Sequence, residues 1–344
     1  MSNHDEVVRR SLLRRSLPAF IGIGVSVGLL AWILRDVSPT DLLRHIRTAK
    51  AAPLAGAVIL ATMTFPLRLV RWRLLLRAEN GDPYAAGPLW HAIALGFMAN
   101  NILPLRAGEL VRSYTAARLA PARFSTVLSS VAVERIFDGL TVVALLAAAL
   151  LGSDLPGSVT IGGTSITSLA RFAGVMGIVA LVAAILVVAA PLTAERVVRR
   201  VLPRTHIADR IVNLIEGVRH GLGVLRSPGR LAGVVLWSLV LWLVNALTFY
   251  IGFLAFDIPV SYAGALLLQG LLVLGISIPS TPGFFGPFEA VIVAVLALYG
   301  VAGSLAFSYA ISYHITTFVP ITLLGLWSMA RTPGGFRVLR RSMV

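Results

Sequence analysis

Three short clusters of polar residues interrupt an otherwise apolar sequence, and the first is suited to binding an anion. It combines Pro104 with Arg106, Glu109 and Arg112, and it follows two adjacent asparagines. If a helix begins near Pro104, its free backbone N–H groups and positive dipole end attract anions. An arginine there suits phosphate, because its planar guanidinium binds two oxygens at once. Glu109 and Arg112 are expected to pair on one helix face. The plainer alternative is a solvated loop with incidental charges.

The second cluster places three charges inside a long apolar run, residues 125–151. Glu134 and Asp138 lie four residues apart and share a helix face, whereas Arg135 is expected to point elsewhere. A charge within a membrane span costs roughly 2.5–3.5 kcal/mol on insertion scales, so these side chains need partners. The available cations are Arg68, Arg71 and Arg112. The cluster is then either a structural ion-pair network or part of a functional site.

The third cluster is a proline- and glycine-rich break that divides residues 262–299 into two short halves. It runs from Pro279 to Pro287, and Glu289 follows at the start of the second half, where a helix dipole favours its charge. Such breaks at membrane depth line cavities or are buried in protein, and they indicate transporter binding sites. A simple turn is the alternative. His314 could carry a proton, but a hydrogen-bonded packing role is favoured.

The first and third clusters share a pattern of proline followed by glycine and glutamate. Pro104-x-x-x-Gly108-Glu109 parallels Pro282-x-x-x-Gly286-x-x-Glu289. We therefore hypothesise an inverted repeat whose two broken segments meet near the middle of the membrane.

The composition places these clusters in a membrane protein. Of 344 residues, 57% are apolar and only 13% are charged, and the mean hydropathy is +0.85. Several apolar runs exceed the ~18 residues needed to cross a bilayer. The absence of cysteine excludes disulfides and thiolate sites, and no metal or cofactor is predicted. The net charge of +15 is interpreted as an orientation signal rather than as nucleic-acid binding.

The predicted fold is an all-α polytopic membrane protein with about six full spans plus broken half-helices. A short amphipathic helix after Ser38 is expected to lie at the membrane interface. Residues 89–103 form the other broken segment. The full spans are predicted at residues 17–34, 53–76, 125–151, 169–190, 231–256 and 305–330.

The basic residues predict the orientation of this single membrane domain, residues 17–330. Arginine-rich segments at residues 1–16, 193–230 and 331–344 are expected on the cytoplasmic side. Both termini would then lie inside, and the predicted location is the bacterial cytoplasmic membrane. The oligomeric state is not predicted.

Taken together, the motifs resemble the lysylphosphatidylglycerol synthase transmembrane, or flippase-like, family. The matching runs are Asn101-x-x-Pro104-x-Arg106-Ala-Gly-Glu-Leu-x-Arg112, Glu134-Arg135-x-x-Asp138 and Pro279-x-x-Pro282-Gly283-x-x-Gly286-x-x-Glu289. The likeness extends from Arg71 to the last span. It implies that membrane lipids are the partners. The sequence ends at Val344 without a soluble aminoacyl-transferase domain, so the chain is not expected to make lysyl-lipid.

The leading functional prediction is a translocase for a phosphate-headed or aminoacylated phospholipid. Arg106, Arg112 and Arg71 would hold the head group, and Glu109, Glu134 and Glu289 would neutralise them or bind a cationic part. The other predicted binding residues are Asn101, Pro104, Gly108, Arg135, Asp138, Pro279, Pro282, Gly283 and Gly286. The alternatives are a transporter of a small soluble anion, an intramembrane enzyme acting on a lipid-linked substrate, and a purely structural partner. No ATP-binding loop is present, so transport is expected to be downhill or ion-coupled. Because the sequence has no Asp-x-Asp metal pair, Ser–His arrangement or metal-binding histidine pair, the chain is not expected to be an enzyme.

Overall fold

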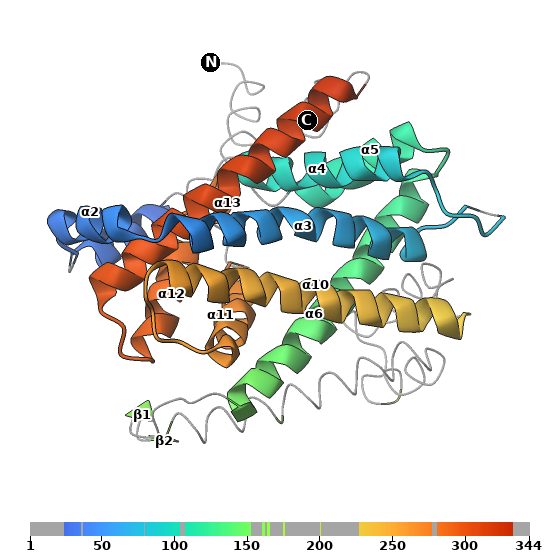
Figure 1. Ribbon diagram of the computed structural model, residues 1–344. Coiled ribbons are helices and arrows are strands. Elements are labelled where there is room, and N and C mark those ends of the chain that lie inside the picture. The colour runs from blue at the N-terminus through green and yellow to red at the C-terminus, as the bar shows by residue number, and fades with distance from the viewer. Residues whose placement is uncertain are drawn as a thin grey trace, which may run out of the picture.

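The computed structural model describes residues 24–35, 37–78, 80–103, 107–152, 227–276 and 281–332, with short pieces between 160 and 200. The described chain is a bundle of helices (Figure 1), with one two-stranded antiparallel ribbon, β1 (Thr160–Ile161) and β2 (Thr164–Ser165). The helices are Gly24–Leu34, α2 (Pro39–Thr48), α3 (Ala51–Leu75), α4 (Ala86–Ile102), α5 (Gly108–Leu119), α6 (Phe124–Gly152), α10 (Pro228–Ala255), α11 (Tyr262–Gly275), η3 (Pro282–Phe284), α12 (Pro287–Ala297) and α13 (Gly303–Arg331).

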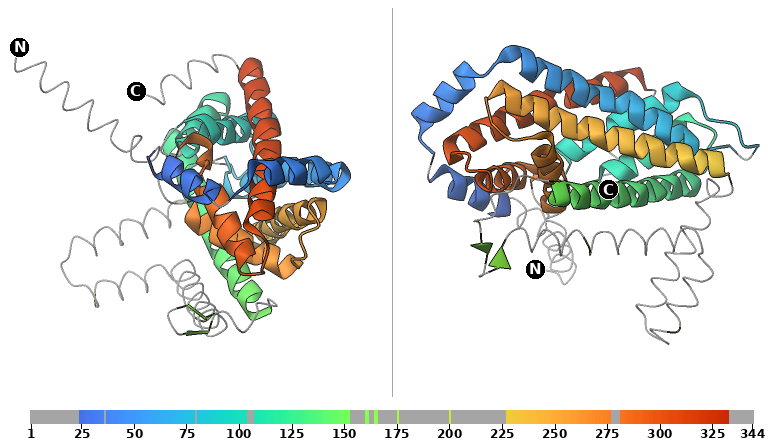
Figure 2. Two further views of the ribbon diagram at one scale, coloured as in Figure 1. Left: turned by 90° about the vertical axis from the view of Figure 1, so that its left-hand side faces the viewer. Right: turned by 60° about the horizontal axis from the view of Figure 1, so that its bottom comes forward.

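Three of the described helices are long and apolar enough to cross a membrane, namely α3, α10 and α13. The 25 residues of α3 extend about 37 Å, which exceeds a hydrocarbon core of about 30 Å. Helices α3 and α10 lie antiparallel along their length (Figures 1 and 2). At one end the Lys50 N–H donates to the Ala255 carbonyl, and at the other end Gly233 packs against Leu74.

The predicted all-α membrane fold is confirmed. Four predicted spans, at 53–76, 125–151, 231–256 and 305–330, coincide with α3, α6, α10 and α13 to within a few residues. The first predicted span is described only from residue 24 onward. The predicted span 169–190, the segment 1–16, and most of 193–230 and 331–344 lie outside the described residues.

The broken segments are short helices, as predicted. Helix α4 has 17 residues and α11 has 14, which correspond to about 26 and 21 Å and fall short of a full span. Between α11 and α12 the backbone takes positive φ at Gly283 (74°), Phe284 (64°) and Gly286 (97°). These angles reverse the chain sharply and account for the two glycines, which alone adopt them without steric cost.

The two broken segments touch each other. Segment η3 packs against the end of α4, where a Cβ on Gly283 would lie 3.4 Å from the Asn101 carbonyl oxygen. Pro104 and Pro279 themselves lie outside the described residues. The contact agrees with the predicted meeting of the two motifs, and the symmetry of an inverted repeat stays a prediction.

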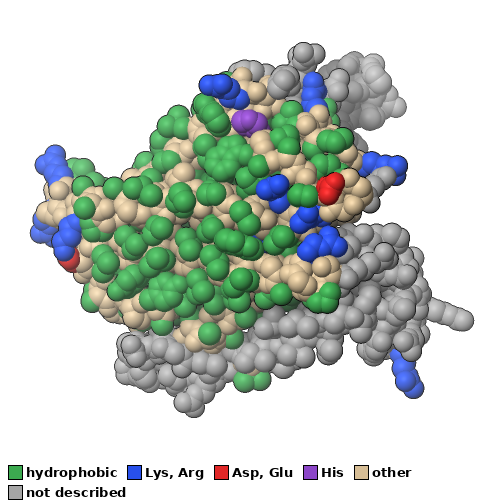
Figure 3. All heavy atoms as spheres, turned by 45° about the vertical axis from the view of Figure 1, so that its right-hand side comes forward, with side chains coloured by type: hydrophobic (Ala, Val, Ile, Leu, Met, Phe, Trp, Pro, Cys, Tyr) green, Lys and Arg blue, Asp and Glu red, His purple; other side chains and the backbone are tan. Residues whose placement is uncertain are grey.

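The distribution of hydrophobic and charged side chains on the surface agrees with a position in a membrane. In the view of Figure 3, hydrophobic side chains cover most of the described face, and lysine and arginine side chains lie at its left and upper edges and in a group on its right-hand part. The amphipathic helix α2 packs against α13 and has no buried residue. An exposed ion pair between Lys50 and Asp257 joins the start of α3 to the end of α10. This arrangement agrees with the predicted interfacial position of α2.

Candidate functional site

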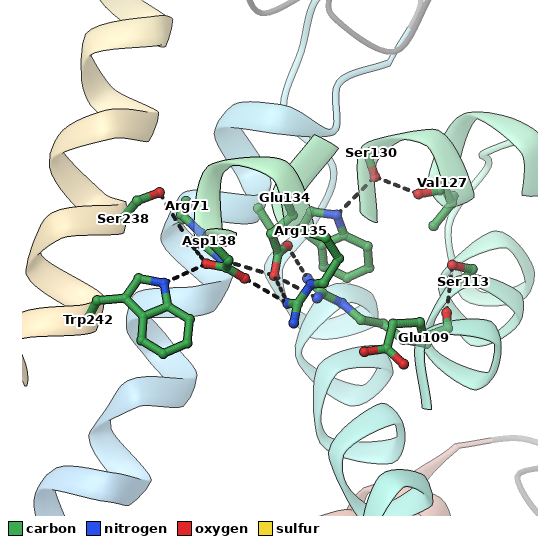
Figure 4. Close-up of polar contacts among 12 residues, drawn as sticks. Arg71, Glu109, Ser113, Val127, Ser130, Glu134, Arg135, Asp138, Ser238 and Trp242 are labelled. Atoms are coloured by element: carbon green, nitrogen blue, oxygen red, sulfur yellow. Dashed lines mark hydrogen bonds and ion pairs between the residues drawn. The ribbon is translucent and has the colours of Figure 1, made fainter. Parts of the chain in front are cut away.

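A buried ionic cluster lies where α3, α5, α6 and α10 meet, and Glu134 of α6 is at its centre (Figure 4). Arg112 of α5 binds this carboxylate with both ends of its guanidinium, at 2.9 Å to Oε1 and 2.8 Å to Oε2. Arg71 of α3 contacts the same Oε1 at 3.0 Å. Both arginines are almost completely buried. The expected supply of cations to Glu134 by Arg71 and Arg112 is confirmed.

Asp138 lies one helical turn further along α6 and connects the cluster to α10. Arg71 contacts its Oδ1 at 2.5 Å, and the Trp242 indole N–H donates to the same oxygen at 2.8 Å. Arg71 also donates to the Ser238 hydroxyl at 3.1 Å. Four helices are therefore fixed to one another through two carboxylates, which supports a structural role for Glu134 and Asp138.

Arg135 does not point away from this cluster, so that prediction is wrong. Its guanidinium contacts Glu134 at 2.9 Å and Asp138 at 3.0 Å, and the side chain remains 42% exposed. Arg135 and Asp138 lie three residues apart, so the long arginine side chain can reach back along the helix. Its exposure leaves Arg135 as the cluster member most open to a ligand.

The expected pair between Glu109 and Arg112 is also absent from the described contacts. Arg112 turns to Glu134 instead, and its guanidinium lies 3.7 Å from the centre of the Trp72 ring. Glu134 is fully buried, so its carboxylate has no water to compensate its charge and needs a bidentate partner. Glu109 is partly exposed, so it needs such a partner less. Figure 4 shows Glu109 beside the cluster and outside its network of dashed contacts.

The sequence suggests Arg68 only as a possible partner for the buried carboxylates, and Arg68 is not among the predicted binding residues. Its side chain is 7% exposed, and its Nε is buried without a hydrogen-bond partner. Its guanidinium lies 4.7 Å from the centre of the Phe97 ring. Among the residues that the structure describes, no carboxylate forms an ion pair with it. The spacing of Arg68 and Arg71 places both on one face of α3, and that spacing was the available signal.

Counted over the residues that the structure describes, the cluster contains more positive than negative charge. Four arginines, namely Arg68, Arg71, Arg112 and Arg135, are close enough to interact electrostatically, and the two buried carboxylates are those of Glu134 and Asp138. Glu109 also interacts with Arg135, but among these described residues the positive charge still predominates by one. Buried charge without a partner is costly, so this surplus favours an anionic ligand.

A small cavity of about 40 Å³ adjoins the cluster. It lies between α4, α5 and α6 and is lined by Gly96, Phe97, Asn100, Gly108, Glu109, Arg112 and Arg135. The cavity has room for only a few water molecules, so the phosphate of a lipid requires it to widen. The predicted residues Gly108, Glu109, Arg112 and Arg135 thus share one cavity.

Close packing of α4 on α5 sets the floor of this cavity. A Cβ on Gly108 would lie 2.2 Å from the Gly96 carbonyl oxygen, so only glycine fits. The Asn100 side-chain oxygen accepts the Gly108 N–H at 2.9 Å and thereby caps the start of α5. The motif does contain a helix start, but the helix begins at Gly108 rather than near Pro104, so Arg106 precedes the helix instead of lying in its first turn. Pro104 and Arg106 lie outside the described residues, so the predicted role of Arg106 stays a prediction.

The third predicted cluster forms a separate site around α12 and α13. Glu289 lies in the first turn of α12, as predicted, and accepts the Gly286 N–H at 2.7 Å. Its other oxygen lies 2.6 Å from His314 Nδ1, so the expected hydrogen bond of His314 is also present. Pro282 and Gly283 belong to η3 beside this pair. Nearby, Asn101 of α4 donates to the Thr322 hydroxyl at 2.9 Å.

Within the part of the chain that the structure describes, no three His, Asp or Glu side chains gather to hold a metal ion. The chemistry of the main site is instead that of guanidinium groups held by carboxylates. Such an arrangement can bind and neutralise an oxyanion inside a membrane.

Comparison with known proteins gives relatives over nearly the whole chain. Glycosyltransferase AglD of Haloferax volcanii is 27% identical over 93% of the chain, and the chain spans 55% of that protein's length. Two UPF0104 membrane proteins of Methanothermobacter thermautotrophicus are 25% and 21% identical over 90% of the chain, and the matches cover 92% and 90% of their lengths.

These names contradict the prediction that the chain is not an enzyme. One relative is named a glycosyltransferase, and the matching family is named after lysylphosphatidylglycerol synthase, so both names are those of enzymes. The prediction relied on the lack of a recognisable catalytic motif, and a missing motif does not exclude catalysis by dispersed residues. Residues 19–325 match the description "lysylphosphatidylglycerol synthase TM region", and the chain belongs to this membrane-protein family.

Proposed function

We propose that this protein binds a phosphate-headed lipid at the cavity beside the arginine cluster and moves it between the two leaflets. The observation that carries the proposal is the surplus of buried guanidinium charge within an apolar helix bundle. A phosphate would supply the missing negative charge. A lipid brings a phosphate to this depth because its acyl chains remain in the hydrocarbon.

The arginines divide into two groups by their contacts. Arg71 and Arg112 are held by Glu134 and Asp138, so they set the shape and field of the site. Arg68 has no carboxylate partner among the described residues, and Arg135 is partly exposed. We assign a direct phosphate contact to Arg135, which lines the cavity. A second contact, after the cavity widens, is assigned to Arg68, which lies against the Phe97 ring that lines it. Arg106 is the contact that the sequence alone suggests.

The membrane context supports this assignment. The broken helices α4, α11 and α12 bring polar backbone into the bundle, where it is tolerated only if protein buries it or it lines a cavity. The likeness to the lysylphosphatidylglycerol synthase family supports a lipid substrate. Arginines lie at the end of the bundle where α3 ends and α10 begins. They support a cytoplasmic position for that end, as the sequence predicts.

A second candidate is a transfer reaction on a lipid-linked substrate. It is favoured by the match to glycosyltransferase AglD, which covers 93% of the chain. The same arginine cluster would then hold the lipid phosphate during transfer. Incubating the purified protein with a phosphate-headed lipid and a nucleotide sugar tests this candidate, and a glycosylated lipid that forms only with intact protein would support it.

The test of the main proposal compares the lipids that copurify with three proteins in mild detergent. Native mass spectrometry of the wild type should show a retained phosphate-containing lipid. Arg68→Met should lose it, and Arg44→Met should keep it, because Arg44 lies on the exposed helix α2. Identical lipids in all three proteins would contradict the proposal.

A second measurement separates lipid from soluble anion. Inorganic phosphate is added to the lipid-loaded wild type at increasing concentration. A lipid site should resist displacement, because the acyl chains add apolar contact that inorganic phosphate lacks. Complete displacement at low phosphate concentration would favour the transporter of a small soluble anion. Movement itself is measured with a head-group-labelled lipid in liposomes that contain each protein.

A further inference from the structure

Glu289 and His314 form an ionisable pair that is buried away from the arginine cluster. Glu289 is fully buried and His314 is 5% exposed. One carboxylate oxygen is held by the Gly286 N–H at 2.7 Å, and the other lies 2.6 Å from His314 Nδ1. Within the described residues, neither side chain has an ion-pair partner other than its neighbour.

The hydrogen bond between the two side chains fixes how many protons the pair can hold. With one proton shared between Oε1 and Nδ1, and none elsewhere, the pair carries one negative charge. A second proton makes the pair neutral overall, either as carboxylate with imidazolium or as carboxylic acid with neutral imidazole. The pair can therefore take up or release one proton without losing its hydrogen bond.

The surroundings of His314 are suited to a ring that becomes positively charged. The imidazole lies between Phe285 and Phe288, whose ring centres are 4.3 and 4.1 Å away and nearly parallel to it. Phe318 meets it edge-on at 6.3 Å. Aromatic faces attract a cation, so this stack stabilises an imidazolium.

The elements packed around the pair contribute hydroxyl, amide and aromatic groups. Helix α12 gives Glu289 itself, and α13 gives His314 and its neighbour Tyr313, whose hydroxyl contacts Thr248 of α10. The helix Gly24–Leu34 gives Ser26, which accepts the Thr281 N–H at 3.1 Å. No Asp, Glu, Lys or Arg side chain from these described elements forms an ion pair with Glu289 or His314.

A chain of contacts links the pair to the arginine cluster. Phe285 stacks on His314, and Gly283 of the same broken segment packs on the Asn101 carbonyl. Asn100, which precedes Asn101 in the chain, caps the start of α5, and α5 carries Arg112. A movement of the broken segment could therefore be transmitted to the cavity through these two adjacent asparagines.

We propose that Glu289 and His314 form a proton-binding site whose occupancy positions the broken segment 281–286. The proton site stands on its own geometry, and its coupling to lipid movement rests on the proposed function. Loss of the second proton leaves one net negative charge among aromatic rings, and this charge favours rearrangement of the segment toward water. Lipid movement would then respond to a proton gradient.

The proton site is tested by infrared titration of the purified protein between about pH 5 and about pH 9, the range in which a histidine partner titrates. A pH-dependent carboxyl or imidazole signal is expected in the wild type and in the control His45→Gln, which changes a histidine of the interfacial helix α2. The carboxyl part of the signal that belongs to Glu289 should be lost in Glu289→Gln. In His314→Gln that carboxyl signal should be altered, because its hydrogen-bond partner is gone.

The same spectra in wild type, Glu289→Gln and His314→Gln would overturn the proton site. Two separate variants are used so that misfolding of one, detected by size-exclusion chromatography, does not remove the test.

Coupling is tested by lipid movement in liposomes with and without an imposed pH gradient. The wild type and His45→Gln should respond to the gradient, and Glu289→Gln should move lipid at a rate that the gradient does not change. Equal gradient dependence in Glu289→Gln would overturn the coupling. If the infrared signal behaves as expected but no variant binds or moves lipid, the proton site stands and the proposed function fails.

Discussion

Replacing Arg68 with methionine is expected to stabilise the empty protein and weaken its binding of a phosphate-headed lipid. Methionine keeps a long apolar side chain that can still pack on Phe97, but it removes a buried positive charge that has no described carboxylate partner. A purely structural arginine would give the opposite result, because its loss would destabilise the bundle. The two measured quantities therefore move in opposite directions only if Arg68 serves a ligand.

The size of each change follows from the burial of Arg68. Replacing buried ionic groups with apolar residues stabilises some proteins by about 1–4 kcal/mol, and the lower half of that range is expected for one side chain. A phosphate 4–6 Å from the guanidinium gains roughly 3–4 kcal/mol at an effective dielectric constant near 20. Partial compensation by Asp138 reduces this to about 2–3 kcal/mol, which is a roughly 30- to 150-fold loss of affinity.

Thermal unfolding in detergent measures the stability, and titration with a short-chain phospholipid measures the affinity. Arg44→Met serves as the matched control, because Arg44 is exposed and its ion pair with Asp41 lies along α2. Unchanged lipid affinity in Arg68→Met would refute the assignment of Arg68 to the ligand. A fall in unfolding temperature together with unchanged affinity would show that Arg68 only supports packing.

The remaining predictions concern packing and charge. Gly108→Ala should destabilise the protein by about 1–3 kcal/mol, because its Cβ would overlap α4, whereas Gly87→Ala has open space and should not; thermal unfolding compares the two. Glu134→Gln should cost about 3–5 kcal/mol, because it leaves buried guanidinium charge without its carboxylate, and unchanged chemical denaturation would contradict the ion-pair network. Lys50→Gln should cost less than about 1 kcal/mol, because its pair with Asp257 is exposed, and a larger shift in unfolding temperature would refute that estimate.

The helices could be predicted from the sequence because apolar length and proline position determine them locally. The spans matching α3, α6, α10 and α13 and the breaks around Gly108 and Gly286 follow from runs of apolar residues and from glycine and proline at their ends. The attraction of Glu289 to a helix start was also predictable, since a first-turn carboxylate is favoured by the dipole.

The side-chain partners could not be predicted, because they depend on how the helices pack. Spacing along one helix suggested Glu109 for Arg112, but packing of α5 on α6 brings the fully buried Glu134 within reach. Helical geometry likewise placed Arg135 away from Asp138, yet its side chain is long enough to turn back. The position of Arg68 on the face of α3 could be predicted, but only the folded bundle shows that its Nε is buried without a hydrogen-bond partner and that no described carboxylate forms an ion pair with it.

The surplus positive charge of the arginine cluster has a consequence for the membrane potential. A phosphodiester with one negative charge would change the net charge of the site by one unit, so the empty and loaded proteins respond differently to voltage. When one elementary charge crosses the whole field of a 100 mV potential, its free energy changes by about 2.3 kcal/mol. This corresponds to roughly a 50-fold change in an equilibrium constant. Under the proposed function, a step that carried the empty cluster through part of the field would therefore be voltage-sensitive, and the resting potential would bias which way the unloaded site faces.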